Sequence, residues 1–221
     1  MRFWPGRNPT PDIKYNGPEG VVIEEKEHLR DLGVELSSDL SFTVHIQNVV
    51  MSSSKLAGWA LRTFRRRSQL VMMTIWKCFV QPKMDYCSQL WSPCNQAAIS
   101  QLKSVQRHFT SKILGMEGNN YWERLQNLKL YSQERIRERY QVIFLWKIFQ
   151  GLVKGYNVEF VTDNRRGQVM VQKTVNWHCP AAVWKARESS IEVKGAKLFN
   201  LLPKEIQNIT SDKVENFKSF G

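Results

Sequence analysis

The sequence predicts a mainly α-helical protein, with short β segments at the N-terminus, then a helical bundle, then a less regular α+β C-terminal segment. Two observations lead to this fold class. Apolar residues recur at spacings of three and four through residues 41–155, as one face of a helix requires. Proline and glycine are instead concentrated in residues 1–20, and the helical spacing fades after Gly155. We therefore expect three parts, at 1–40, 41–155 and 156–221.

Two short β segments are expected in the first part. Residues 21–25 and 32–36 are short apolar or alternating runs on either side of the charged KEHLRD stretch. That stretch does not have the composition of a standard two-residue hairpin turn.

The first two helices are predicted from periodicity and from proline. Asp39 or Ser41 would cap the first helix. A second helix, over 69–81, should end before Pro82, because proline disfavours α geometry in the residue before it. The first helix has an apolar stripe made of Ile46, Val49, Val50, Ser53, Ala57, Ala60, Leu61 and Phe64.

Further helices are predicted at 97–114, which Gly115 would stop, at 121–130, and at 133–152 with Gly151 near its end. A strand over 169–175 and a short helix over 195–202, closed by Pro203, follow. Four or five helices with short links make a bundle. The expected buried stripes are Ile99, Leu102, Val105, Phe109 and Ile113 in the first of these helices, and Ile136, Tyr140, Ile143, Phe144 and Ile148 in the longest.

The positive charge of the chain is concentrated in one region. The formal net charge is +12, and residues 36–116 hold ten Lys and Arg against only Asp39 and Asp85. Such a segment attracts polyanions, of which nucleic acid is the commonest in cells. The alternative is a basic surface that only favours solubility.

Eight cations are the candidates for phosphate contact. Arg62, Arg65, Arg66 and Arg67 form a cluster at a helix end, where cations are also favoured by the helix dipole. The others are Lys55, Lys103, Arg107 and Lys112, for which a solvated helix face is the alternative. Of four tryptophans considered, Trp59, Trp76, Trp91 and Trp146, most are assigned to packing and not to base stacking.

The sequence offers no catalytic or metal-binding constellation, and no cofactor is expected. Cys78, Cys87, Cys94 and Cys179 do not have zinc-ligand spacings and are interpreted as reduced, buried thiols. Paired carboxylates for two-metal chemistry are missing. The start has no apolar signal region, and no run is long enough to cross a membrane, so an intracellular protein is expected.

Six ordered blocks resemble the C-terminal part of the reverse transcriptases of jockey-like non-LTR (LINE-type) retrotransposons. They are LRDLGVELSSDLSFTVHI at 29–46, the block of 66–93 with FVQPKMDYCSQLWSP, VQRHFTSKI at 105–113, YWERLQNLKL at 121–130, the helix of 134–152, and FNLLPKEI at 199–206. Two departures, Gln81 where arginine is usual and Phe199 where tryptophan is usual, fit either a degenerate copy or tolerated variation.

The resemblance implies a function that the residues alone do not. Asp31, Leu32, Gly33 and Val34 would correspond to the hairpin of the primer grip, and the following helices to the thumb, which lies against the template–primer duplex. The catalytic aspartates of the family lie upstream of these blocks. The implied protein is thus a truncated reverse-transcriptase fragment, not itself an enzyme, whose partners would be RNA or RNA–DNA duplex and a palm and fingers region supplied by a longer protein. The alternative is a relic or a structural, protein-interaction helical module.

Overall fold

The computed structural model describes residues 26–39, 41–154, 160–163, 168–171 and 190–207, together with Asn16 and Gly20. The described chain is mostly helical, with an antiparallel pair of short strands before the helices. The predicted fold class is confirmed.

The strands of the N-terminal β hairpin lie at other positions in the sequence than predicted. Strand β1 (His28–Asp31) pairs antiparallel with β2 (Val34–Ser37), with Asp31 opposite Val34. The turn residues Leu32 and Gly33 have φ of 45° and 86°, as a two-residue type I′ turn requires. The first strand therefore lies within the charged KEHLRD stretch, and the strand predicted at 32–36 begins only at Val34. Residues 21–25 lie outside the described residues.

Helix α1 (Thr43–Thr63) begins one residue after Phe42, which is its N-cap and makes no side-chain capping bond. The predicted caps are wrong, because Asp39 Oδ1 accepts a hydrogen bond from the Ser41 N–H at 2.9 Å and so stabilises the turn before the helix. The predicted stripe is buried except for Val50, which is half-buried, and Phe64, which is the exposed C-cap.

The second helical segment continues through Pro82, contrary to the prediction. Helix α2 (Gln69–Ile75) passes into a π-helical stretch, η1 (Trp76–Val80), and then into α3 (Gln81–Asp85). Proline in an α-helix removes a hydrogen bond and crowds the carbonyl four residues back. Here the Gln81 N–H donates to the Trp76 carbonyl, five residues back, so the wider π turn alters the backbone immediately before Pro82.

Of the next three helices, α4 and α6 are short and α5 is longer. Helix α4 (Ser88–Trp91) precedes α5 (Gln96–Thr110), which the Asn95 side chain caps by accepting from the Ala97 N–H at 2.9 Å. Helix α5 ends before the predicted stop at Gly115, although Ile113 is still buried in the turn that follows. Helix α6 (Tyr121–Asn127) has a capping box of Asn120 and Glu123.

Helix α7 (Gln133–Phe149) does not bury the stripe that periodicity predicts. Ile136 is buried, but Tyr140, Ile143, Phe144 and Ile148 are only half-buried. The reason is that α7 has neighbours on more than one side, namely α4, α5 and the later helix α9 (Ile191–Asn200). The buried residues of α7 are Gln133, Ile136, Arg137, Gln141, Leu145 and Trp146.

After α7, the described part of the chain forms a pair of strands and two helices. Strands β3 (Phe160–Asp163) and β4 (Gln168–Val171) form an antiparallel pair, so the predicted strand at 169–175 corresponds to β4 as far as the described residues extend. Helix α9 starts earlier than the predicted 195–202, and Pro203 separates it from α10 (Lys204–Gln207).

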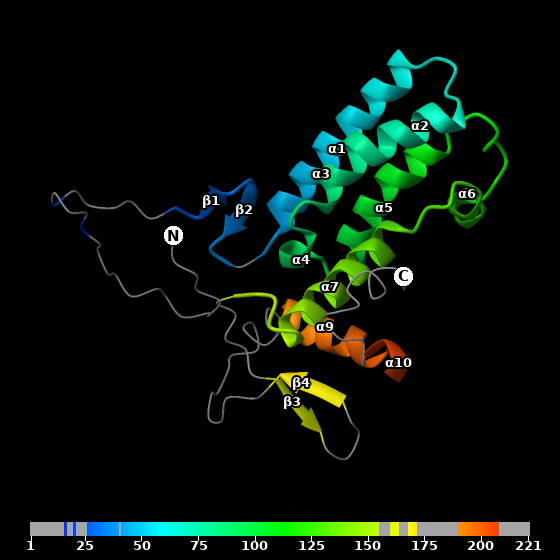
Figure 1. The fold of residues 1–221 in the computed structure, drawn as a ribbon. Coiled ribbons are helices and arrows are strands. Elements are labelled where there is room, and N and C mark those ends of the chain that lie inside the picture. The colour runs from blue at the N-terminus through cyan, green and yellow to red at the C-terminus, as the bar shows by residue number, and fades with distance from the viewer. Residues whose placement is uncertain are drawn as a thin grey trace.

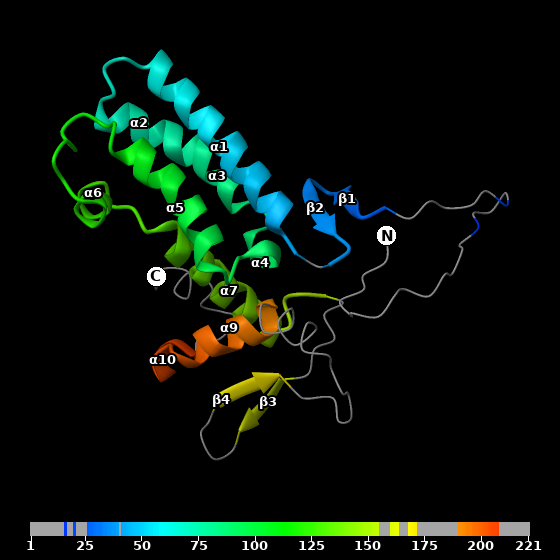
Figure 2. The same ribbon diagram turned by 180° about the vertical axis from the view of Figure 1, so that it is seen from behind.

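The main core lies between three rods of helix. Helices α1, α2–η1–α3 and α5 run side by side, and α7 crosses beneath them with α9 beside it (Figures 1 and 2). Trp76, Met72, Met84, Leu102 and Phe109 are fully buried in this core. A second, smaller core joins Leu145 and Trp146 of α7 to Ala196 and Phe199 of α9.

Burial of the tryptophans and cysteines follows the expectation only in part. Trp76, Trp91 and Trp146 are buried and Trp59 is 48% exposed, so most of these four tryptophans pack, as predicted. The thiols of Cys78, Cys87 and Cys94 are free and exposed, not buried, and Cys179 lies outside the described residues. None of the described helices combines the length and hydropathy needed to cross a lipid bilayer.

Candidate nucleic-acid interface

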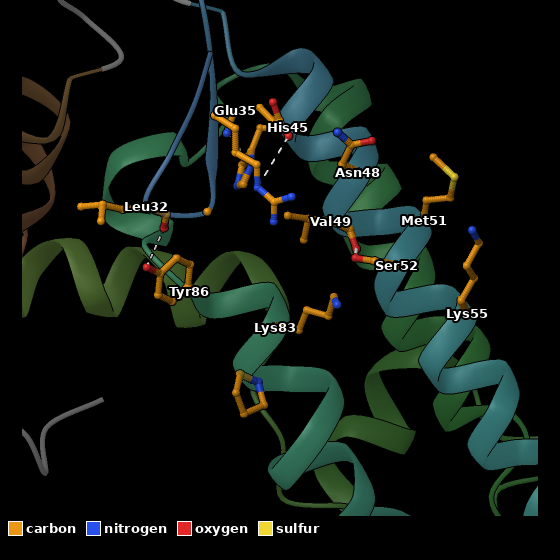
Figure 3. A pocket seen from close by; sticks show the side chains of 13 residues that line it. Leu32, Glu35, His45, Asn48, Val49, Met51, Ser52, Lys55, Lys83 and Tyr86 are labelled. Atoms are coloured by element: carbon orange, nitrogen blue, oxygen red, sulfur yellow. Dashed lines mark hydrogen bonds and ion pairs between the residues drawn. The ribbon is translucent and has the colours of Figure 1, made fainter. Parts of the chain in front are cut away.

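A cavity of about 870 Å³ lies between the β1–β2 hairpin, α1 and α3 (Figure 3). Leu32 and Gly33 of the turn form one side, Asn48, Ser52 and Lys55 of α1 another, and Lys83 of α3 a third. In the view of Figure 3, Lys83 extends from α3 toward α1. The remaining described lining residues are Arg30, Glu35, His45, Val49, Met51, Pro82 and Tyr86.

The hairpin is attached to the helices at two points. The Tyr86 hydroxyl, just after α3, donates to the Leu32 carbonyl at 2.8 Å and so ties the tip of the turn. On β2, directly after the turn, the Glu35 N–H donates to His45 Nδ1 at 3.2 Å, and Val34 is buried against the main core. The cavity is therefore bounded by elements that are held together, not by a free loop.

The cavity is electropositive. Among the described lining residues, Arg30, Lys55 and Lys83 are opposed by one carboxylate, Glu35, which lies 3.9 Å from Arg30 Nε. His45 does not add to this charge, because burial lowers its pKa, with a smaller opposing effect from Glu35. Hydroxyl, amide and ammonium groups around a concave surface can bind an anion with several oxygen atoms.

A second cavity, of about 400 Å³, lies between the start of α1 and the start of α5. Its lining includes Phe42, Ile46, Trp91, Pro93 and Ala98, and none of the described residues that line it is charged. Of these two cavities, only the hairpin cavity has cationic side chains among its described lining residues.

The four residues that the resemblance assigns to a primer grip have different environments. Leu32 and Gly33 line the cavity at the turn. Val34 is 4% exposed and belongs to the core, and Asp31 is exposed at the end of β1. The hairpin is present, and two of its four nominated residues face the cavity.

Lys55 is the one nominated cation that lines the cavity, and most of the others lie at the far end of α1. Arg62, Arg65 and Arg66 are exposed there, and Lys112 is exposed just after α5. The Leu114 N–H donates to the Arg67 carbonyl at 2.9 Å, which brings the loops after α1 and after α5 together at one end of the bundle (Figure 1). Arg67 itself is half-buried, with φ of 44°.

Two nominated cations are engaged within the protein. Lys103 forms an ion pair with Glu134 at the start of α7. The Arg107 guanidinium lies over the Tyr121 ring, 4.9 Å from its centroid. Both contacts join α5 to its neighbours, so they account for these residues without a phosphate.

Sequence reasoning did not nominate Arg30, Lys83, Asn48, Ser52 or Tyr86 as site residues. Asn48 has a signal in the sequence, because it precedes Lys55 by seven residues and Arg62 by fourteen and so shares their face of a helix. Arg30 and Lys83 have no such signal, because they reach the cavity from other elements.

A buried polar seam separates α7 from α3 and α4. Arg137 is 3% exposed, donates to the Gln133 carbonyl at 2.9 Å and lies over the Trp91 ring. Burial raises the pKa of Asp85 to about 6. The nearby Arg137, and the hydrogen bonds of the Asp85 carboxyl with Gln81 and Tyr140, lower this pKa and only partly oppose the effect of burial. Burial also lowers the pKa of Arg137 to about 10.

Within the described part of the chain, no three His, Cys, Asp or Glu side chains are grouped so that they could hold a metal ion.

Comparison of the chain with models of protein families, with curated proteins and with solved structures finds no match in any of the three.

Proposed function

We propose that this chain binds the sugar–phosphate backbone of an RNA or RNA–DNA duplex, as the primer-grip and thumb part of a reverse transcriptase of the jockey-like non-LTR type. Polymerase catalysis would come from a palm and fingers region of a longer protein. The resemblance of the six sequence blocks suggests this identity, and the proposal extends it to the residues that would touch nucleic acid.

The observation that carries the proposal is the electropositive cavity between the hairpin turn and α1. Arg30, Lys55 and Lys83 approach it from three elements, and only Glu35 opposes them among the described lining residues. A backbone-directed site needs cations and hydrogen-bond donors around a hollow, and no base-specific geometry.

The exposed arginines extend this surface. Lys55 and Arg62 lie seven residues apart on α1, hence on one face of the helix and about 10 Å apart along it. Arg65 and Arg66 follow in the loop. A duplex bound at the cavity and running along α1 would meet cations at both ends of the helix.

Salt-dependent binding tests the proposal. Affinity for a 20-base-pair RNA–DNA hybrid should fall with salt, and the slope of log affinity against log salt should decrease by about 2 in the double variant K55Q/K83Q. The matched control is K197Q/K204Q, which removes the same charge from exposed positions on α9 and α10, away from the cavity. Neutralising Arg65, Arg66 and Arg67 together should also reduce the slope.

Three results would contradict the proposal: no binding at low salt, binding without a salt slope, or the same slope change in both lysine pairs. Extension of a primer by the chain alone, with Mg²⁺ and nucleotides, would contradict its lack of a catalytic site.

A further inference from the structure

Trp59 differs from Trp76, Trp91 and Trp146 because it is not buried in a core. It lies on α1 with 48% of its surface exposed, whereas Trp76 on the neighbouring rod is fully buried. A single exposed apolar side chain is common on protein surfaces, so the surroundings of the Trp59 ring decide whether it can serve a ligand.

Cations lie on both sides of this ring. Lys55 precedes Trp59 by four residues and Arg62 follows it by three, so each is one turn away on the same face of α1. A side-chain carbon at Gly58 would lie 3.4 Å from Arg62 Nη1, so the Arg62 guanidinium lies back along the helix next to Gly58, the residue before Trp59.

The ring is also held in place. The Phe64 ring meets it edge to face, with centroids 6.3 Å apart and planes at 89°. Phe64 is fixed as the C-cap of α1, where its N–H donates to the Ala60 carbonyl at 3.0 Å. A ring supported by such an edge contact keeps its orientation before any ligand binds, which lowers the entropic cost of stacking.

Charge indicates the class of partner. An aromatic face between cations suits a nucleic-acid strand, whose bases stack on the ring while neighbouring phosphates meet the cations. Trp122, which is 61% exposed on α6, provides the contrast, because the residues three and four positions on either side of it are Gly118, Asn119, Leu125 and Gln126. Exposure alone therefore does not indicate a base-stacking site, whereas exposure together with cations one turn away on both sides does.

We infer that Trp59, flanked by Lys55 and Arg62, is a stacking platform for an unpaired base of a single-stranded extension that continues from the duplex bound at the hairpin cavity. The inference rests on the proposed function, because Lys55 belongs both to the cavity and to this platform. The distance along the helix from Lys55 to Arg62, about 10 Å, corresponds to two or three nucleotides at about 3.4 Å each.

The test compares two ligands and matched variants of the full chain. A blunt RNA–DNA hybrid and the same hybrid with a six-nucleotide single-stranded extension are titrated against wild type, W59A, W59F and W122A. Wild type should bind the extended hybrid more tightly. W59A should lose about tenfold affinity for the extended hybrid and keep its affinity for the blunt one, W59F should retain most of the preference, and W122A should behave as wild type.

Equal affinities of wild type for the two hybrids would overturn the inference and leave the proposed function standing. So would equal effects of W59A and W122A. Absence of binding to the blunt hybrid, with binding of the extended one that W59A abolishes, would instead overturn the cavity proposal and keep the platform as a single-strand site.

Discussion

Replacing Asp85 with asparagine should remove a pH dependence of stability that the fold imposes. Asp85 is the last residue of α3 and faces the buried seam along α7. Asparagine has nearly the same shape as the protonated aspartic acid and stays neutral at every pH. The variant therefore changes the charge of the seam with little change in its packing.

The sign and size follow from the pKa. Burial raises the pKa of Asp85 from 3.8 to about 6 in the folded chain. Between these values the folded state keeps a proton that the unfolded state has released, so stability falls as pH rises through this window. The whole loss amounts to about 3 kcal/mol and is complete above the folded pKa. The attraction of Arg137 is already contained in this value, since without it the pKa would be higher still.

Urea unfolding between pH 3.5 and 7.5 measures the effect. The free energy of unfolding of D85N minus that of wild type should increase by about 3 kcal/mol across the range. Taking the difference cancels the contributions of other groups, including His45, whose lowered pKa acts in the opposite direction. D31N, at an exposed position on β1, is the control and should follow wild type. If D85N and wild type give parallel curves, the reasoning on the buried carboxyl is wrong.

Two local substitutions give further predictions. L32N should stabilise the chain by about 1 kcal/mol, because Leu32 is 83% exposed with φ of 45° and asparagine tolerates this left-handed conformation better. Thermal unfolding measures the change in stability, and a lower melting temperature of L32N would contradict the prediction. N120A should destabilise the chain by about 1 kcal/mol in urea unfolding, because it removes the acceptor of the Trp122 and Glu123 N–H groups. The control is N127A, at the exposed end of the same helix, which should have less effect on stability.

The sequence predicts best the helices that bury one face. In α1 and α5, residues such as Ile46, Val49, Leu102 and Phe109 follow the period of the helix because each helix packs one side on the main core. In α7 the same method fails, because α4, α5 and α9 cover different sides and even Gln133 and Arg137 become buried. A pattern read along one helix has no information about how many neighbours it will have.

The candidate site was predictable only in its parts. The resemblance locates the hairpin and the charge count finds Lys55. The convergence of Arg30 and Lys83 depends on tertiary contacts of the hairpin, among them the Tyr86–Leu32 hydrogen bond between residues 54 positions apart. Counting charges also cannot separate free cations from engaged ones, as the ion pair of Lys103 with Glu134 shows.

The π turn before Pro82 determines in which direction α3 points its side chains. A hydrogen bond to the fifth residue back encloses one residue more than an α turn does. Deleting one residue from 76–80 would remove this extra residue and rotate everything after it by about 100° about the helix axis. Met84 would leave the core and Lys83 would leave the cavity, with the sequence of α3 unchanged. The spacing of the five residues upstream is thus as much a part of the hairpin cavity as Lys83 itself.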